Sequence, residues 1–192
     1  MNKRILAVAA AVTLALAGAT GCSTTMSSTG GADPSVKRQS IDANVDGALS
    51  RLYEKSPGAR ELVSKARGTL VFPSVVSAGF VVGGSYGQGA LRMRGAPEEY
   101  YSLAAGSVGL LAGADSKVVV LLFMTQEALD KFESSKGWTV GADAGVTLVT
   151  VAANVEIDSK TAQQAIIGFV MTNGGLMANV SLEGAKFSRL ML

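Results

Sequence analysis

Residues 83–87, with the sequence GGSYG, are the stretch of this chain closest to a catalytic motif. They fit the G-x-S-x-G pattern of a nucleophile elbow, in which a serine sits on a sharp strand-to-helix turn. That serine needs a base to accept its proton, and the 192-residue chain has no histidine and no S-x-x-K lysine. We therefore expect Ser85 to lie in a glycine-bent strand, and we expect no enzymatic activity.

Two other features could bind small ligands. The backbone amides of residues 87–89, GQG, could hold a phosphate, although a hairpin or β-bulge is the simpler interpretation. Asp115 and Asp143 each end a Gly-Ala-Asp triplet and could bind a hard cation together, but aspartate more often caps turns. We expect no metal and no cofactor, and we expect Glu98 and Glu99 to lie in a solvated loop.

Basic residues give the strongest functional signal. Residues 50–67 carry five positive and two negative side chains. Near an anionic membrane each basic side chain contributes about 1 kcal/mol, so three net charges contribute about 3 kcal/mol. Alternatively, these basic residues form a solvated edge of the helices, where they interact with the negative C-terminal end of the helix dipole. The predicted lipid-binding residues are Lys37, Arg51, Lys55, Arg60, Lys65 and Arg67, with Arg92 and Arg94 extending the patch from one strand face.

Residues 1–21 have the pattern of a lipoprotein signal peptide. Lys3 and Arg4 precede an apolar run over residues 5–16, which spans roughly 18 Å and is too short for a bilayer core of about 30 Å. Small residues and Cys22, the only cysteine, follow in a sequence, ATGC, that resembles a bacterial lipobox. The resemblance implies cleavage before Cys22 and a diacylglyceryl group on its sulfur. An ordinary secretory signal is the alternative.

Residues 22–34 are rich in Ser, Thr and Gly and predict a flexible tether. By resemblance to enterobacterial sorting, Ser23 after the cysteine favours the outer membrane, with the domain facing the periplasm. Loss of Lys3 and Arg4 with the signal lowers the 17 basic residues to 15, equal to the 15 acidic ones. A nucleic-acid partner is not expected for a chain without net positive charge.

Two helices are predicted before any strand. The second begins with Ser56 as N-cap and Pro57 at its first position, and it ends with Gly68 at the C′ position. The first covers residues 35–56, and its apolar side chains fall within one arc of about 100°. These side chains are Ile41, Val45, Ala48, Leu49 and Leu52.

From residue 68 onward the pattern turns mostly to strands. We expect strands at 69–72 (stopped by Pro73), 80–94, 100–112, 117–124, 138–151, 166–171 and 176–183, with a helix at 126–134. Glycines within strands indicate bulges and sharp curvature. We predict an α+β domain over residues 35–192, in which a helical lead-in (35–67) packs on a β-rich core (68–192). The core is a strongly curved, mostly antiparallel sheet or a partly closed barrel.

Six short segments occur in an order that is specific although each alone is weak. They are GTLVFP at 68–73, AGF at 78–80, GGSYGQG at 83–89, GSVG at 106–109, GADA at 141–144 and SLEG at 181–184. In this order they resemble the SYLF domain, a lipid-binding family of bacteria and eukaryotes. The resemblance covers residues 68–191, about two thirds of the chain.

The resemblance implies a module that binds lipid headgroups or a membrane. Eukaryotic members bind phosphoinositides and, in some fungi, actin, which we do not carry over to a bacterial lipoprotein. In eukaryotic members an amphipathic segment before the domain helps membrane contact, and residues 35–68 occupy that place here. The sequence therefore favours a lipid-anchored, non-enzymatic envelope protein that binds phospholipid. The alternative is a structural or adaptor lipoprotein that binds another envelope protein.

Overall fold

A computed structural model describes residues 33–79, 82–96, 98–108, 113–149, 163–172, 175–176 and 181–192. Residues 32–192 form a unit of their own, and this unit contains every described helix and strand. The predicted signal peptide, Cys22 and the tether up to residue 32 lie outside the described residues.

Two N-terminal helices form as the sequence predicts. Helix α1 (Pro34–Lys55) begins after Asp33, whose Oδ1 accepts a hydrogen bond from the Ser35 amide at 2.8 Å. Its buried residues are the five apolar ones of the predicted arc. Helix α2 (Pro57–Lys65) follows with Ser56 as N-cap, although the Ser56 side chain makes no capping bond.

The predicted C′ position for Gly68 is wrong. Helix α2 ends at Lys65, and Ala66 is already extended. Gly68 instead begins the first strand, where an added Cβ would lie 2.8 Å from Cδ1 of Leu129. Gly68 is therefore packed against the Leu129 side chain and does not terminate the helix.

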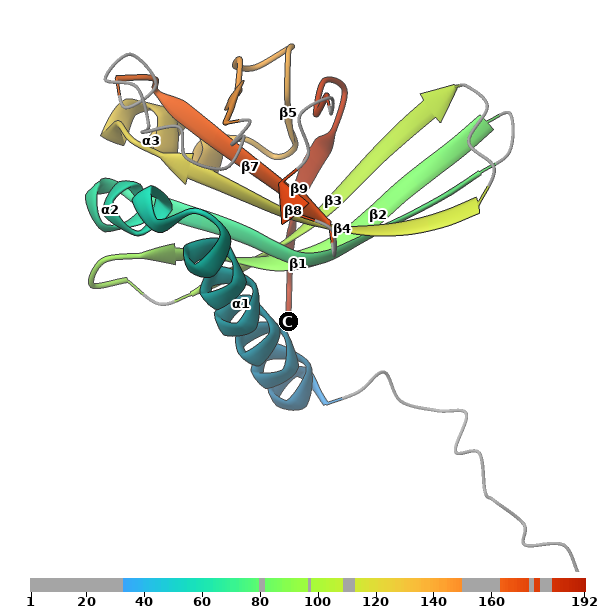
Figure 1. The fold of residues 1–192 in the computed structure, drawn as a ribbon, viewed down its shortest axis with the longest axis horizontal. Coiled ribbons are helices and arrows are strands. Elements are labelled where there is room, and N and C mark those ends of the chain that lie inside the picture. Colours follow the sequence, from blue (N-terminus) through green and yellow to red (C-terminus); the bar gives the residue numbers. More distant parts are fainter. Residues whose placement is uncertain are drawn as a thin grey trace, which may run out of the picture. The chain divides into compact units, whose positions relative to one another are not determined.

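One curled sheet holds nine strands within the described residues, in the order β5-β9-β3-β2-β1-β4-β7-β6, with β8 paired to β7 (Figure 1). Of the strand pairs that these residues form, only β6 and β7 run parallel. The bounds are β1 Gly68–Gly79, β2 Val82–Met93, β3 Glu99–Val108, β4 Gly113–Phe123, β5 Trp138–Thr139, β6 Thr147–Leu148, β7 Ile166–Thr172, β8 Gly175–Leu176 and β9 Lys186–Leu190, and helix α3 covers Gln126–Ser134. The predicted α+β fold with N-terminal helices on a strongly curved, mostly antiparallel sheet is confirmed.

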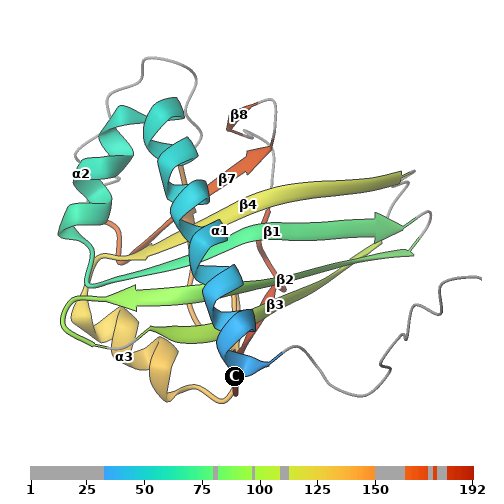
Figure 2. The same cartoon turned by 90° about the horizontal axis from the view of Figure 1, so that it is seen from below.

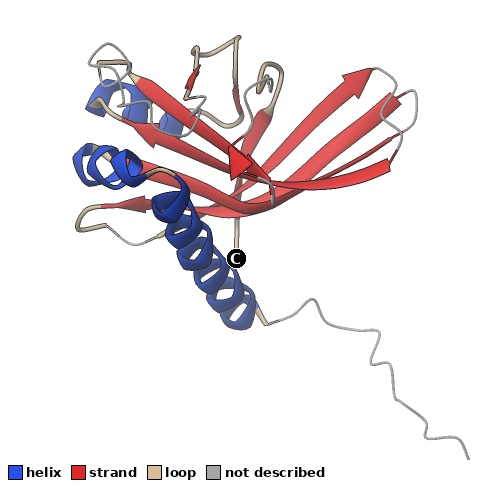
Figure 3. Ribbon diagram, viewed as in Figure 1, coloured by secondary structure: helices blue, strands red, loops and turns tan. Residues whose placement is uncertain are grey.

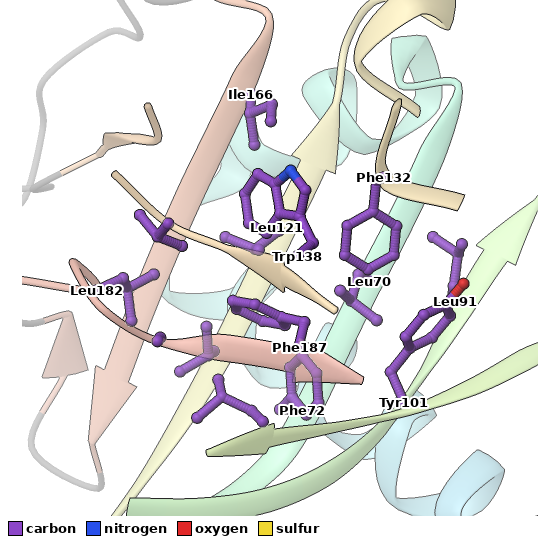
Figure 4. Close-up of a cluster of buried hydrophobic side chains, with 14 of the residues drawn as sticks. Leu70, Phe72, Leu91, Tyr101, Leu121, Phe132, Trp138, Ile166, Leu182 and Phe187 are labelled. Atoms are coloured by element: carbon purple, nitrogen blue, oxygen red, sulfur yellow. The ribbon is translucent and has the colours of Figure 1, made fainter. Parts of the chain in front are cut away.

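Each face of the sheet carries its own hydrophobic cluster. Helices α1 and α2 cover one face, packing on Val71, Ala90, Val120 and their neighbours (Figure 2). The other, concave face holds an aromatic cluster around Phe132 and Trp138, whose ring centroids are 5.5 Å apart (Figure 4). Strand β4 is therefore buried on both faces over residues 118–123, as its continuous apolar run predicts.

A β-bulge in β1 corrects the prediction that Pro73 stops the strand. Val71 pairs with Ala90, but Ser74 pairs with Gln88, so β1 has one extra residue here. Proline cannot donate to a ladder and is tolerated at a bulge, so the strand continues to Gly79. Opposite the bulge, a Cβ on Gly89 would overlap the Val71 carbonyl oxygen, which explains the glycine of the GQG segment.

Beyond the bulge the four central strands continue away from the helices (Figure 3). We call this part the wing; it comprises residues 74–79, 82–88, 103–108 and 113–117. The extra residue reverses the alternation of β1, so Val75 packs in the concave cluster whereas Val76, half exposed, turns to the helix side.

The end of the chain differs from the prediction. A strand is predicted over 176–183, but only Gly175–Leu176 pairs there as β8, and Ser181–Glu183 lie outside any strand; residues 177–180 are outside the described part. A turn at Gly184, with φ of 77°, separates this segment from β9. Strand β9 is not predicted, because among its five residues only Phe187 is buried and no alternation results.

Candidate functional site

Half of the predicted cations are held by partners within the domain. Arg92 lies with Nη1 2.5 Å from Asp46 Oδ1 and Nε 2.7 Å from Glu98 Oε1, so it joins α1 to the sheet. Arg94 donates to the Ser64 carbonyl. These two side chains do not extend an open patch on the strand face.

Helix α2 holds two further cations locally. Lys65 pairs with Glu61 at 2.6 Å, and the Arg60 guanidinium lies 4.3 Å from the centroid of the Tyr53 ring. Both basic side chains remain exposed, so the contacts leave them available to an anionic surface.

Lys37, Arg51, Lys55 and Arg67 form no ion pair with the residues that the structure describes. Arg67 follows α2, and its backbone amide donates to the Phe123 carbonyl at 2.8 Å. Arg51 and Lys55 are one turn apart on α1 and lie beside the core residue Leu52.

Arg51 and Lys55 face a cavity of about 280 Å³ between α1, the bulge of β1, β4 and the end of β7. None of its lining residues in the described chain is acidic. Two are cationic residues of α1; Lys117 of β4 also borders the cavity, but it pairs with Val75, so its side chain belongs to the concave face of the sheet. The lining consists of Arg51, Lys55, Pro73, Ser74, Ser116, Lys117, Val118, Met171 and Thr172.

The bulge places hydroxyl groups among these cations. Ser74 follows Pro73 directly, and its Oγ lies 3.0 Å from Oγ of Ser116 on the neighbouring strand. Arginine offers a planar fork of donors, lysine a point charge and serine a further donor. Two cations and two hydroxyls without a carboxylate can bind an anion such as a phosphate group.

Ser74 and Ser116 are the site residues that sequence analysis missed. They are 42 positions apart in the chain, and only the pairing of β1 with β4 beyond the bulge brings their hydroxyls together. Two isolated serines in strand segments give no sequence signal that could have linked them to Arg51 and Lys55.

The opposite edge of α1 is acidic. The Tyr100 hydroxyl donates to Asp42 Oδ2 at 2.9 Å, and burial together with this carboxylate raises the pKa of Tyr100 to about 12. Burial and the nearby Asp42 also raise the pKa of Glu98, although Arg92 opposes the shift. This edge fastens the helix to β2 and β3.

The prediction of a solvated loop at Glu98 and Glu99 is wrong. Glu98 pairs with Arg92, and Glu99 begins β3, where it pairs with Arg189 and accepts from the Tyr101 hydroxyl at 2.9 Å. Burial is the first cause that raises the pKa of Tyr101, and its bond to Glu99 adds to it. Sequence analysis predicts solvent exposure for two adjacent glutamates when it cannot identify their partners. Here the pairing of Glu99 with Arg189, far along the chain, could not be predicted.

The remaining chemical motifs have structural roles. Ser85 lies in the middle of β2, with Oγ 2.8 Å from Oγ of Ser77, and not on a strand-to-helix turn. Asp143 accepts from the Thr139 amide at 2.6 Å, and Asp115 accepts from the Ser116 amide at 2.8 Å. No cluster of three metal-ligating side chains occurs in the described residues.

A family model described as "Ysc84: Las17-binding protein actin regulator" matches residues 104–190, from β3 to β9. This match supports assignment of residues 104–190 to the SYLF-domain family. This is a family of binding and adaptor proteins, with roles in membrane or lipid binding or related to actin regulation. No curated protein sequence matches the chain. None of the helices in the described ranges combines the length and the apolar composition needed to cross a bilayer.

Proposed function

We propose that this SYLF protein is a lipid-anchored, non-enzymatic protein of the bacterial envelope that binds anionic phospholipid headgroups. The observation that supports the proposal is the cavity beside α1, where Arg51 and Lys55 meet Ser74 and Ser116 without a carboxylate in the described lining. The ligand would be the headgroup phosphate.

Anchor and cavity act together in this proposal. Each basic residue near an anionic surface contributes about 1 kcal/mol, so the cavity alone gives weak binding. An acyl group on Cys22 would hold the domain at the membrane, and the tether of residues 22–34 would then make headgroup binding intramolecular. We place the anchor in the outer membrane, with the domain in the periplasm.

Vesicle co-sedimentation tests the cavity. Residues 23–192 contain the whole unit of residues 32–192 and lack the cysteine. Arg51→Gln/Lys55→Gln should weaken binding to phosphatidylglycerol vesicles at low salt about thirtyfold, the effect of two charges at about 1 kcal/mol each. Lys136→Gln/Lys186→Gln removes the same charge at exposed residues outside the predicted patch and should bind nearly as the parent does. Equal loss in both variants, or no binding by the parent, would contradict the proposal.

Mass analysis of the full chain made in bacteria tests the anchor. We expect cleavage between Gly21 and Cys22, and diacylglyceryl and fatty acyl groups, such as palmitate, on Cys22. The Cys22→Ser chain should lack this modification and be lost from outer-membrane fractions. An unmodified Cys22 in a freely diffusing periplasmic protein would contradict the anchor. Binding in the cavity is tested separately, by vesicle co-sedimentation.

An adaptor role is the second candidate. The matching family model is named for a protein-binding regulator, so a protein partner in the envelope deserves a direct test. In-cell crosslinking from the domain should recover one such partner if this role is correct. Binding to it should then be insensitive to the Arg51→Gln/Lys55→Gln change.

A further inference from the structure

The wing has one face without a described charged side chain. On the side of the sheet that carries α1, Val82 is 71% exposed, Tyr86 52% and Val76 50%. The other residues of this face with described side chains are small or polar and uncharged. They are Ser74, Ala78, Gly84, Gln88, Ala104, Gly106 and Ser116. We call this surface the wing face.

The reverse side of the wing is different. Ser77 and Ser85 join their hydroxyls there at 2.8 Å, and Asp115 is exposed. The two sides therefore differ in polarity, although the same four strands form both. An uncharged apolar side opposite a polar one is the pattern of an element at an apolar boundary.

The wing face borders the cationic cavity directly. Ser116, which lines the cavity, pairs with Val76; Val76 pairs with Tyr86, and Tyr86 pairs with Ala104. These four residues form one row across the sheet. Cations and exposed apolar side chains thus lie next to each other on the same side of the domain, which matches the order of phosphate and acyl layers in a lipid leaflet.

We propose that the wing face is the surface that enters the interfacial layer of the bilayer, with the cavity at the level of the lipid phosphates. The proposal rests on the proposed function in that the cavity receives a headgroup. Moving a charged side chain out of water is costly, and entry of this face moves no described charge out of water. Tyr86 has an apolar ring and a hydroxyl that accepts from Gln88 Nε2 at 2.9 Å, the amphipathic character typical of residues at membrane interfaces.

Charge argues for lipid over a second copy of the chain. A second copy packed on this face would bring its own Arg51 and Lys55 to the same side, and the described wing face has no carboxylate to offset them. An anionic lipid surface offers the complementary charge and an apolar layer together.

Site-specific fluorescence tests the orientation. Residues 23–192 contain no cysteine, so Val82→Cys and Asp115→Cys each give a single site for an environment-sensitive dye, one on each side of the wing. With phosphatidylglycerol vesicles, the dye at 82 should shift to the blue and be quenched by lipids that carry a spin label on the acyl chain. The dye at 115 should do neither. Quenching at 115 but not at 82 would overturn the proposal.

A charge on the wing face provides the matching affinity test. Val82→Asp should weaken vesicle binding about tenfold, because it removes an apolar contact and adds a charge at the interface. Asp115→Asn serves as the control on the reverse side and should not weaken binding. Val82 is exposed, so the thermal midpoint of the variant should equal that of the parent; Val82→Ser, with a smaller loss, checks the result without a charge.

Glycerol 3-phosphate separates this proposal from the proposed function. Its binding should be lost in Arg51→Gln/Lys55→Gln and unchanged in Val82→Asp. If it binds in the cavity but the dye at 82 never meets lipid, the wing proposal fails alone. If it does not bind, headgroup recognition in the cavity fails, whatever the dye reports. A dimer in sedimentation that Val82→Asp disrupts, without lipid contact at 82, would identify a second copy as the occupant and overturn the proposal.

Discussion

Strand β1 passes through two regions that differ in what covers them. Over residues 68–72 every residue is buried, with the helices on one face and the aromatic cluster on the other. Over residues 74–79 only Val75 is buried. Both stretches are rich in residues that favour strands, and both form β1. Their different burial therefore depends on which elements cover the strand. Residues 68–72 therefore contribute to the stability of the fold. Residues 74–79, in the wing, contribute little to the core and can form a contact surface.

The largest contrast should come from aromatic truncation. Phe132 is 1% exposed and its ring centroid lies within 4.8 Å of Phe123 and 4.9 Å of Tyr101. Phe132→Ala should lower the free energy of unfolding by about 3–5 kcal/mol. Tyr86→Ala in the wing should change it by less than about 0.5 kcal/mol. Urea denaturation measures both, and similar losses would remove the distinction between the two regions.

Glycine substitutions sharpen the contrast at the bulge. Gly89→Ala places a Cβ against the Val71 carbonyl and should cost about 1–3 kcal/mol through a forced backbone shift. Gly84→Ala is the matched control in the same strand, because its Cβ would meet nothing closer than the Ala105 carbonyl oxygen at 3.9 Å. Thermal unfolding should show a lower midpoint for the first variant only.

Ion pairs provide a smaller effect. Arg92 is 26% exposed and connects α1 to the sheet, whereas Lys65 is 60% exposed and pairs within α2. Arg92→Ala should cost about 1–2 kcal/mol and Lys65→Ala about 0.3–0.5 kcal/mol. A double-mutant cycle of Arg92 with Asp46 isolates the bond between helix and sheet. A coupling no larger than that of Lys65 with Glu61 would contradict the assigned role.

The smallest effect is a pH dependence at the edge of α1. Burial and Asp42 raise the pKa of Glu98, so the folded state holds this proton more tightly than the unfolded state. The associated stability is present below the usual glutamate pKa and is lost as pH rises through the raised pKa. The parent should therefore lose stability relative to Glu98→Gln between about pH 4 and about pH 7. Urea midpoints across this range measure it, and a constant difference would contradict the shift.

Local patterns predicted the elements that local physics controls. The apolar arc of α1, the helix at 126–134 and the doubly buried strand β4 were all readable because each depends on spacing or on an unbroken apolar run. The continuation of β1 through Pro73 could not be predicted, because the bulge depends on how β1 pairs with β2 and β4. The strand predicted over 138–151 is two strands of two residues each, β5 and β6, and β9 was not predicted; strands this short have too few residues to show a period.

The candidate site likewise contains residues that the sequence predicted and residues that it did not. Arg51 and Lys55 could be predicted because they share one helix, four residues apart. Their separation from Arg92 and Arg94 could not be predicted, because the acids that bind Arg92 come from α1 and from the residue just before β3. Ser74 and Ser116 enter the site only through strand pairing.

Taken alone, the sequence determined the signal and tether pattern, the amphipathic face of α1, the α+β class and the glycine-rich order of the SYLF family, all of which depend on residues close together in the chain. The tertiary structure decided which cations are paired, where the acid-free cavity lies and that an apolar wing face borders it. The physical reason is that charge pairing and exposure depend on distances between segments far apart in sequence, and a curled sheet with one bulge sets those distances.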